Sequence, residues 1–179
     1  MKDLQPKFNT RVVVMLGMMT ALEIVFERLL VIETPITRFS LTFLPRAVCG
    51  ACLGPLYGAV VGGIADVLGG IMKGFTINPF ITGAAVLRGI TYGCLLFKKQ
   101  TPVRIIIASA LDQFVAGLVV TTIGLVVYGF LPMNIGALIP RLVQSLILFV
   151  LEVLLLIPFR KILFTQTKKA MEQRNDERF

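Results

Sequence analysis

Ionisable side chains lie inside long apolar stretches of the 179-residue sequence, and a charged group within a membrane is by default a candidate for function. An arginine presents a planar fork of donors to a carboxylate or to the acceptor atoms of a heteroaromatic ring. Each charge costs about 2.5–3.5 kcal/mol at a helix centre, so we expect most of these groups to face the bundle interior or its ends. The set is Glu23, Glu27, Arg28, Arg46, Asp66, Arg88, Asp112, Arg141 and Glu152.

The residue types that most enzymes need are scarce. The sequence has no histidine, which removes the commonest general base and metal ligand. Cys49, Cys52 and Cys94 lie in apolar surroundings, and the Cys-x-x-Cys spacing lacks the second pair that a zinc site requires. Asp66 and Asp112 are far apart in sequence and are expected at opposite depths. We therefore predict that the protein is not an enzyme and has no catalytic residues, metal or cofactor.

The elements that must position these groups are membrane helices. Hydrophobic residues make up 56% of the chain and charged residues 16%, against roughly 45–50% and about 25% in an average globular protein. A helix needs about 20 apolar residues to cross a bilayer. The first stretch is not expected to be a signal peptide, because charged residues follow its apolar start. We predict one all-α integral membrane domain over residues 1–179, with six transmembrane helices at 12–32, 41–53, 56–72, 80–97, 103–130 and 135–159.

The distribution of positive charge orients this bundle. The formal net charge is +8, and the predicted outer loops contribute only Arg38 and Lys73 to it. Because cytoplasmic loops are enriched in Lys and Arg, both termini are predicted to be cytoplasmic. Topology then accounts for most of the net charge, and no nucleic-acid partner is expected. The inner positive charges are Lys2, Lys7, Arg11, Lys98, Lys99, Arg104, Arg160, Lys161, Lys168 and Lys169.

Several of the polar side chains converge on the outward-facing half in this topology. Arginines 28, 88 and 141 are expected near outer helix ends, and residues 73–80 connect the third and fourth spans with aromatic and hydrogen-bonding side chains. Positive charges outnumber negative ones in this half, which favours a small ligand that bears an anionic group. The predicted binding residues are Glu27, Arg28, Phe75, Thr76, Asn78, Phe80, Arg88, Arg141 and Gln144.

Interior ion pairing is the alternative role for the same charges. We expect Arg46 to pair structurally with Asp66, and Glu27 to pair with an arginine. For Arg88 and Gln144 we favour ligand contact. Asp112 and Glu152 are placed in the inner half, where a structural or partner-binding role is expected.

Glycine spacing indicates close helix packing. Gly54, Gly58 and Gly62 recur every four residues, which lets helices approach closely in lipid. No glycine pattern matches a phosphate-binding loop. On the first span, Gly17 and Ala21 form a further small-xxx-small pair, which either packs internally or docks another membrane subunit.

The stretch 39–69 resembles the substrate-binding (S) components of energy-coupling factor (ECF) vitamin transporters, most closely their folate-specific branch. The motifs that carry the resemblance are Leu-Gly-Pro-x-x-Gly at 53–58, Gly-Gly-x-x-Asp at 62–66, Gly-x-Thr-x-x-Pro-Phe at 74–80 and Leu-Arg-Gly-Ile-Thr-Tyr-Gly at 87–93. In topology the resemblance covers nearly the whole chain, whereas its motifs are confined to residues 39–99.

The resemblance implies a prokaryotic, multi-pass subunit of the cell membrane that binds a vitamin from outside with very high affinity. Such a subunit joins a transmembrane coupling (T) subunit and two cytoplasmic ATPases, and it tips over in the membrane to release its cargo. Gly17 and Ala21 match the family's docking motif, and Glu33–Ser40 and Lys73–Pro79 match its gating loops. The chain lacks the proline that often precedes Gly-Phe-Thr in the second loop.

The family resemblance favours folate as the ligand, whereas charge favours only an anionic vitamin. The positive outer half disfavours a cationic vitamin such as thiamine, and folate combines two carboxylates with a flat pterin ring. Pantothenate, biotin and a pyridoxine-like precursor remain alternatives that charge does not separate. An integral membrane enzyme lacks the necessary residues here, and a channel or secondary carrier predicts duplicated halves or broken helices, which the sequence does not display.

Overall fold

The computed structural model describes residues 10–33, 38–74, 77–97, 100–129 and 135–176, and every long element in these ranges is helical. This confirms the predicted all-α architecture and adds one short antiparallel hairpin, in which Ile32 pairs with Phe39. The elements are α1 (Thr10–Leu29), β1 (Val31–Glu33), β2 (Arg38–Ser40), α2 (Phe43–Leu53), α3 (Pro55–Lys73), α4 (Pro79–Leu96), α5 (Pro102–Ala110), the π-helix η2 (Leu111–Val120), α6 (Thr121–Val127) and α7 (Ile135–Asp176).

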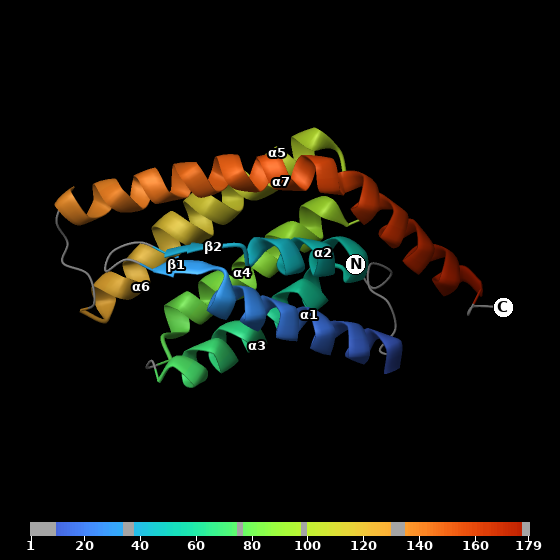
Figure 1. Cartoon of the computed structure of the whole chain (residues 1–179), viewed down its shortest axis with the longest axis horizontal. Coiled ribbons are helices and arrows are strands. Elements are labelled where there is room, and N and C mark those ends of the chain that lie inside the picture. The colour runs from blue at the N-terminus through green and yellow to red at the C-terminus, as the bar shows by residue number, and fades with distance from the viewer. Residues whose placement is uncertain (1–9, 34–37, 75–76, 98–99, 130–134, 177–179) are drawn as a thin grey trace.

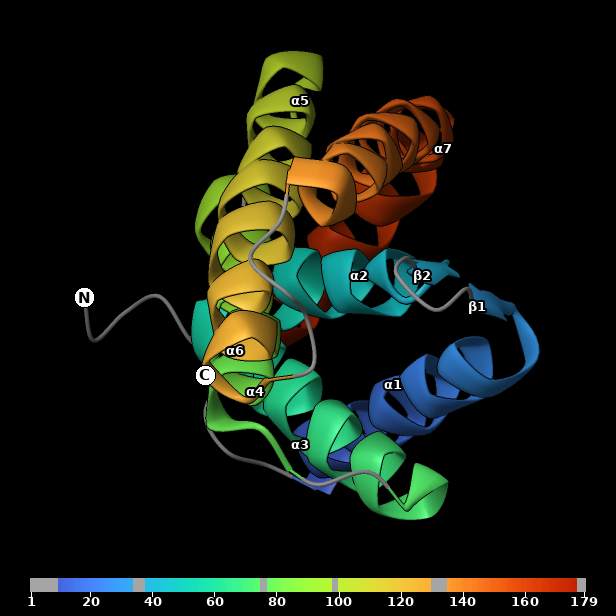
Figure 2. The same cartoon turned by 90° about the vertical axis from the view of Figure 1, so that its left-hand side faces the viewer.

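The helices run back and forth along one direction, and α5, η2 and α6 follow one another as a single long helix (Figure 1). The β1–β2 hairpin, the start of α4 and the end of α6 lie at one end of the bundle. The start of α1 and the end of α7 lie at the other end. Seen from the left-hand end of Figure 1, α2 lies inside the bundle, where it contacts α1, α3, α4 and α7 (Figure 2).

Four helical segments are long and apolar enough to cross a membrane: Pro55–Lys73, Pro79–Leu96, Pro102–Val127 and Leu138–Arg160. Helix α2 is apolar but only 11 residues long, and α1 carries three charged residues in its second half. The structure therefore supports a membrane protein, while the count of six spans and their orientation stay predictions.

Proline, glycine and asparagine set the helix ends around α3 and α4. Proline occupies the first turn of both helices, where its missing N–H costs nothing. Gly54 has φ 98° between α2 and α3, and Gly74 ends α3 with φ 68°, a left-handed conformation that favours glycine. Asn78 caps α4, because its side-chain oxygen accepts the Phe80 N–H at 3.0 Å. These residues determine where α3 begins and ends and where α4 begins.

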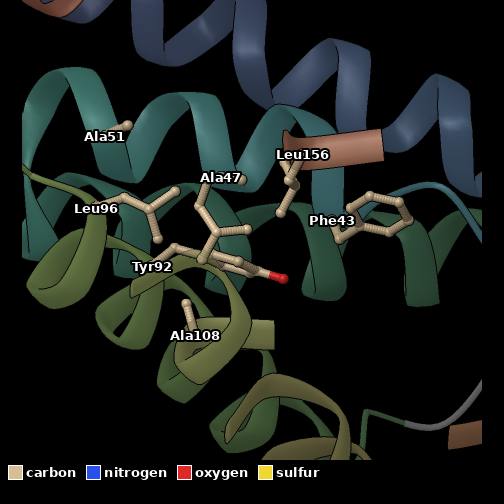
Figure 3. Close-up of a cluster of buried hydrophobic side chains, with 8 residues drawn as sticks. Phe43, Ala47, Ala51, Tyr92, Leu96, Ala108 and Leu156 are labelled. Carbon is tan, nitrogen blue, oxygen red and sulfur yellow. The ribbon is translucent and has the colours of Figure 1, made fainter. Parts of the chain in front are cut away.

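Helices α2, α3 and α4 touch through their backbones, as the glycine spacing predicts. A Cβ added to Gly58 would lie 2.6 Å from the carbonyl oxygen of Gly89, and one added to Gly50 would lie 2.8 Å from the backbone nitrogen of Gly93. The hydrophobic cluster beside this contact includes Tyr92 (Figure 3). Its other members are Phe43, Ala47, Ala51, Leu96, Ile105, Ala108 and Leu156.

Replacing Gly89 by alanine tests this contact. The new Cβ would overlap the carbonyl of Gly58, so we expect a loss of about 1–3 kcal/mol of stability, measured as a lower thermal midpoint in detergent. Gly83→Ala is the matched control on α4, because that site is exposed and open; it should be neutral or stabilising by up to about 1 kcal/mol. Equal midpoints for Gly89→Ala and wild type would contradict the close packing.

Candidate ligand-binding centre

A buried ion pair joins the first two helices. Arg46 on α2 donates from its guanidinium to the carboxylate of Glu23 on α1, and both side chains are almost fully buried. The predicted pairing of Arg46 with Asp66 is wrong. The Asp66 carboxylate on α3 points toward α4 instead, where the Thr82 hydroxyl donates to it at 2.7 Å. Glu27, one turn after Glu23, has the Lys73 ammonium 3.8 Å away at the end of α3.

A second polar group lies where α4, η2 and α7 meet. The Arg88 Nε atom is 3.7 Å from Asp112 Oδ1. The side-chain amide of Gln113 donates to Asp112 Oδ2 at 3.2 Å and to Glu152 Oε2 at 3.0 Å. Asp112 and Glu152 are 2% and 0% exposed, so the two carboxylates depend on this amide and on nearby arginines.

This arrangement corrects the predicted depths. Arg88 is the tenth residue of the 18-residue helix α4, at its middle and not at its outer end. Asp112 and Glu152, expected apart from it in the inner half, meet it in one cluster. The positive charges of Arg46 and Arg88 both act on these two carboxylates, so the Glu23–Arg46 pair between α1 and α2 contributes to the electrostatics of the same centre.

Arg141 brings a further positive charge to this centre. Its side chain is 7% exposed on α7, and the charge that acts on it most is the like charge of Arg88. Gln144 follows one turn later and is half-buried. The structure thus places Arg88 and Arg141, which the sequence singles out, close enough to repel each other. Among the described residues, no carboxylate forms an ion pair with Arg141.

Several buried polar atoms of the centre have no hydrogen-bond partner among the described residues. Buried polar groups in proteins are normally satisfied, so unused ones indicate a place for water or for a ligand. Both donors and acceptors are left over here, and within the described ranges they find no hydrogen-bond partner. These atoms are Arg46 Nε, Arg88 Nε and Arg141 Nη1 as donors, and Glu23 Oε2, Asp112 Oδ1 and Glu152 Oε1 as acceptors.

The remaining predicted residues lie nearer the end of the bundle that holds the hairpin. Arg28 is in the last turn of α1. Asn78 is buried, and its amide nitrogen donates to the Gly124 carbonyl at 3.1 Å while its oxygen caps α4, so it fastens α4 to α6. Phe80 is exposed and meets Tyr128 edge-on, with ring centroids 6.5 Å apart. The predicted residues Phe75 and Thr76 lie outside the described residues.

Gln113 is the residue that sequence reasoning missed. Its signal was an adjacent polar pair, Asp112-Gln113, in an otherwise apolar run. Glu152 stands eleven residues after Arg141, about three helical turns, which places both on one face of α7. In the described part of the chain, no three His, Cys, Asp or Glu side chains gather to hold a metal.

An apolar depression on α7 is a different feature. Its lining comes from one face of a single helix and contains no polar surface: Leu146, Ile147, Val150, Leu151 and Leu154. Such a face suits lipid chains, so we place the ligand centre among the buried polar groups and not here.

Apolar helices of membrane-spanning length around a buried polar centre are the features of an integral membrane protein. The family model of the substrate-specific component of ECF transporters matches residues 11–160. The chain belongs to this family, which consists of transporter subunits and not enzymes.

Relatives within the family carry a more specific name. The folate transporter FolT of Clostridium novyi (strain NT) is 32% identical over 149 residues, which cover 79% of this chain and 83% of that protein. FolT of Leuconostoc mesenteroides is 30% identical over 159 residues and 83% of each chain.

Solved structures agree with this assignment. The crystal structure of FolT bound with folic acid superposes with a TM-score of 0.74 at 30% identity, covering 82% of this chain and 89% of that one. The structure of the S component of a bacterial ECF transporter has a TM-score of 0.58 at 17% identity, covering 86% and 97%, and supports the fold alone.

The Glu23–Arg46 pair should be tested by a double-variant cycle. Arg46→Met leaves a buried carboxylate unpaired, and we expect it to destabilise the protein by about 3–5 kcal/mol. Adding Glu23→Gln removes the unpaired charge, so the double variant should recover part of the loss, measured by thermal midpoints in detergent. Arg104→Met, half-buried at the start of α5, is the control. No recovery in the double variant would contradict the pairing.

Proposed function

We propose that this protein is the folate-binding subunit of an ECF-type ABC importer in a prokaryotic cell membrane. The observation that carries the proposal is the buried centre with unspent donors and acceptors, in a chain at least 30% identical to two folate transporters and to a folic-acid-bound structure. Arg88 and Arg141 supply fork-shaped donors in a desolvated site, where hydrogen bonds to charged groups count most.

The ligand enters from the end of the bundle that holds the hairpin. In this proposal that end faces outward, both termini are cytoplasmic, and six spans cross the membrane. The two predicted gates are Glu33–Ser40 and Lys73–Pro79. The first includes β2 of the hairpin, and the second runs from the end of α3 to the start of α4, beside the exposed ring of Phe80.

A transmembrane coupling subunit and two cytoplasmic ATPases complete the importer. Gly17 and Ala21 are exposed on α1, and a Cβ on Gly17 would meet nothing within 4 Å. Exposed apolar side chains such as Met18 and Leu22 surround them. This outward small-xxx-small surface permits close approach of a partner helix, which supports its proposed use for docking and subsequent tipping.

Titration of the purified, ligand-free protein with folic acid tests the proposed ligand directly. We expect saturable binding with heat release, and folate retained by protein from folate-grown cells, detected by mass spectrometry. Pantothenate, biotin and thiamine serve as competitors that should leave folic acid bound. Displacement by one of them, or no heat on folic acid addition, would overturn the assignment.

Arg88→Ala should weaken folic acid binding about 10- to 100-fold, because it removes a charged hydrogen-bond donor from the centre. Arg88→Lys keeps the charge near Asp112 but loses the planar fork, so it should also bind weakly while folding normally. Arg104→Ala, at the start of α5, is the control and should bind like wild type. Unchanged affinity in both Arg88 variants would show that Arg88 forms only a structural ion pair with Asp112 and does not bind the ligand.

Ala21→Leu should abolish co-purification with the coupling subunit and leave folic acid affinity unchanged, because the added bulk lies outside the bundle. Val103→Leu, exposed on a different helix, α5, is the control and should retain the complex. Retention of the complex by Ala21→Leu would contradict docking at this surface, and loss of folic acid binding would show that the residue acts within the fold.

A further inference from the structure

Two thiols share one buried face of α2. Cys49 and Cys52 are 0% and 6% exposed, and residues three apart on a helix lie on the same face, with Cβ atoms about 5–6 Å apart. The Cys52 thiol and the Glu23 carboxylate both act electrostatically on Cys49, so both groups lie near it. A buried cysteine often serves only as a small apolar residue, so its neighbours decide whether it can do more.

The Glu23–Arg46 pair fixes how α1 and α2 lie against each other. The β1–β2 hairpin reverses the chain between the two helices, so they run in opposite directions (Figure 1). Met19 lies four residues before Glu23 on α1, and Cys49 lies three residues after Arg46 on α2. Each step is about one helical turn, so Met19 and Cys49 face each other one turn away from the ion pair.

The next turn repeats this arrangement. It brings Met15 on α1 opposite Cys52 on α2, again four residues back and three residues on. Met15 and Met19 are half-buried, and both pack against the hydrophobic cluster that contains the two cysteines, as this register requires. Two thioethers and two thiols therefore gather where α1 meets α2. Cys94, the third cysteine, is exposed on α4.

Sulfur ligands of these two kinds select a soft ion. Zinc is bound by thiolates, imidazoles and carboxylates, whereas thiolates together with thioethers suit Cu(I). The sequence predicts no zinc site at Cys49-x-x-Cys52, because a second thiol pair is missing, and the structure supplies methionines in its place. A monovalent cation and one thiolate form a neutral unit, which costs much less in an apolar interior than an unpaired charge.

We infer that four sulfur atoms between α1 and α2 form a site for a soft monovalent ion, Cu(I) or Ag(I): those of Met15, Met19, Cys49 and Cys52. On binding, the S–H bond of one cysteine breaks, its proton passes to water, and the thiolate bonds to the ion. The other three sulfur atoms coordinate through lone pairs, and no electron is transferred. Met18 is 66% exposed beside this seam and offers a first thioether to an arriving ion.

Cu(I) titration of the purified full-length protein tests the site. A Cys94→Ala parent removes the exposed thiol, and Cu(I) is supplied as its acetonitrile complex without oxygen. We expect one ion per protein to be retained on gel filtration. The thermal midpoint in detergent should rise, because a ligand that binds only the folded state stabilises it. A parent protein that retains no Cu(I), or one whose midpoint does not change, would overturn the inference.

Single variants of this parent separate the two kinds of ligand. Cys49→Ala should weaken Cu(I) binding about 100-fold, and Met19→Leu, which keeps the side-chain volume, should weaken it about 10-fold. Met72→Leu is the matched control, because this methionine is exposed on α3, and it should bind like the parent. Full affinity in either Cys49→Ala or Met19→Leu would contradict the four-sulfur site.

X-ray absorption at the copper edge needs no variant at the site. A first shell of sulfur alone in the Cu(I)-loaded parent supports the inference, and nitrogen or oxygen in that shell overturns it. This spectrum also decides the matter if Cys49→Ala does not fold. The ion site stands apart from the proposed function, so a protein that failed to bind folic acid would still be expected to retain Cu(I).

Discussion

Charges buried inside an apolar bundle must be matched within that bundle, and this constraint organises the structure. Glu23 and Arg46 satisfy it as a pair on the two helices that begin the fold. Asp112 and Glu152 satisfy it only in part, through one shared glutamine amide and the fields of nearby arginines. Removing one partner of such a set is far more costly than the set contributes as a whole, so each charge constrains its neighbours.

Close helix packing places these charges at one level. The 11-residue helix α2 lies in the middle of the bundle and carries Arg46 to its centre. It can do so because Gly50, Gly58, Gly89 and Gly93 let α2, α3 and α4 meet backbone to backbone. Larger residues at these positions would widen the spacing between the helices and separate the polar groups that now meet. The positions of the buried charges therefore depend directly on how closely these helices pack.

Incomplete satisfaction of the buried polar groups is the reason for proposing this centre as the binding site. A fully paired network would gain no hydrogen bonds from a ligand. Buried donors and acceptors without a partner would gain them, so a ligand that supplies the missing partners is bound more tightly. Family membership places the chain among transporter subunits, and relatives named for folate fit a centre with groups of both kinds. The proposed outward end, with its hairpin and exposed aromatic ring, stands between this centre and the ligand's surroundings.

The sequence by itself determined the helical architecture and the helix ends around α3 and α4, because proline, glycine and a capping asparagine act within a few residues of themselves. It also singled out Arg88 and Arg141, since a charge in an apolar run is visible without a structure. Only the tertiary structure decided the partners: Arg46 binds Glu23 and not Asp66, and Arg88 meets Asp112 at mid-helix. Pairing depends on the face and depth that each helix presents, and those follow from the central position of α2 and the π-helical turn of η2, which local sequence does not reveal.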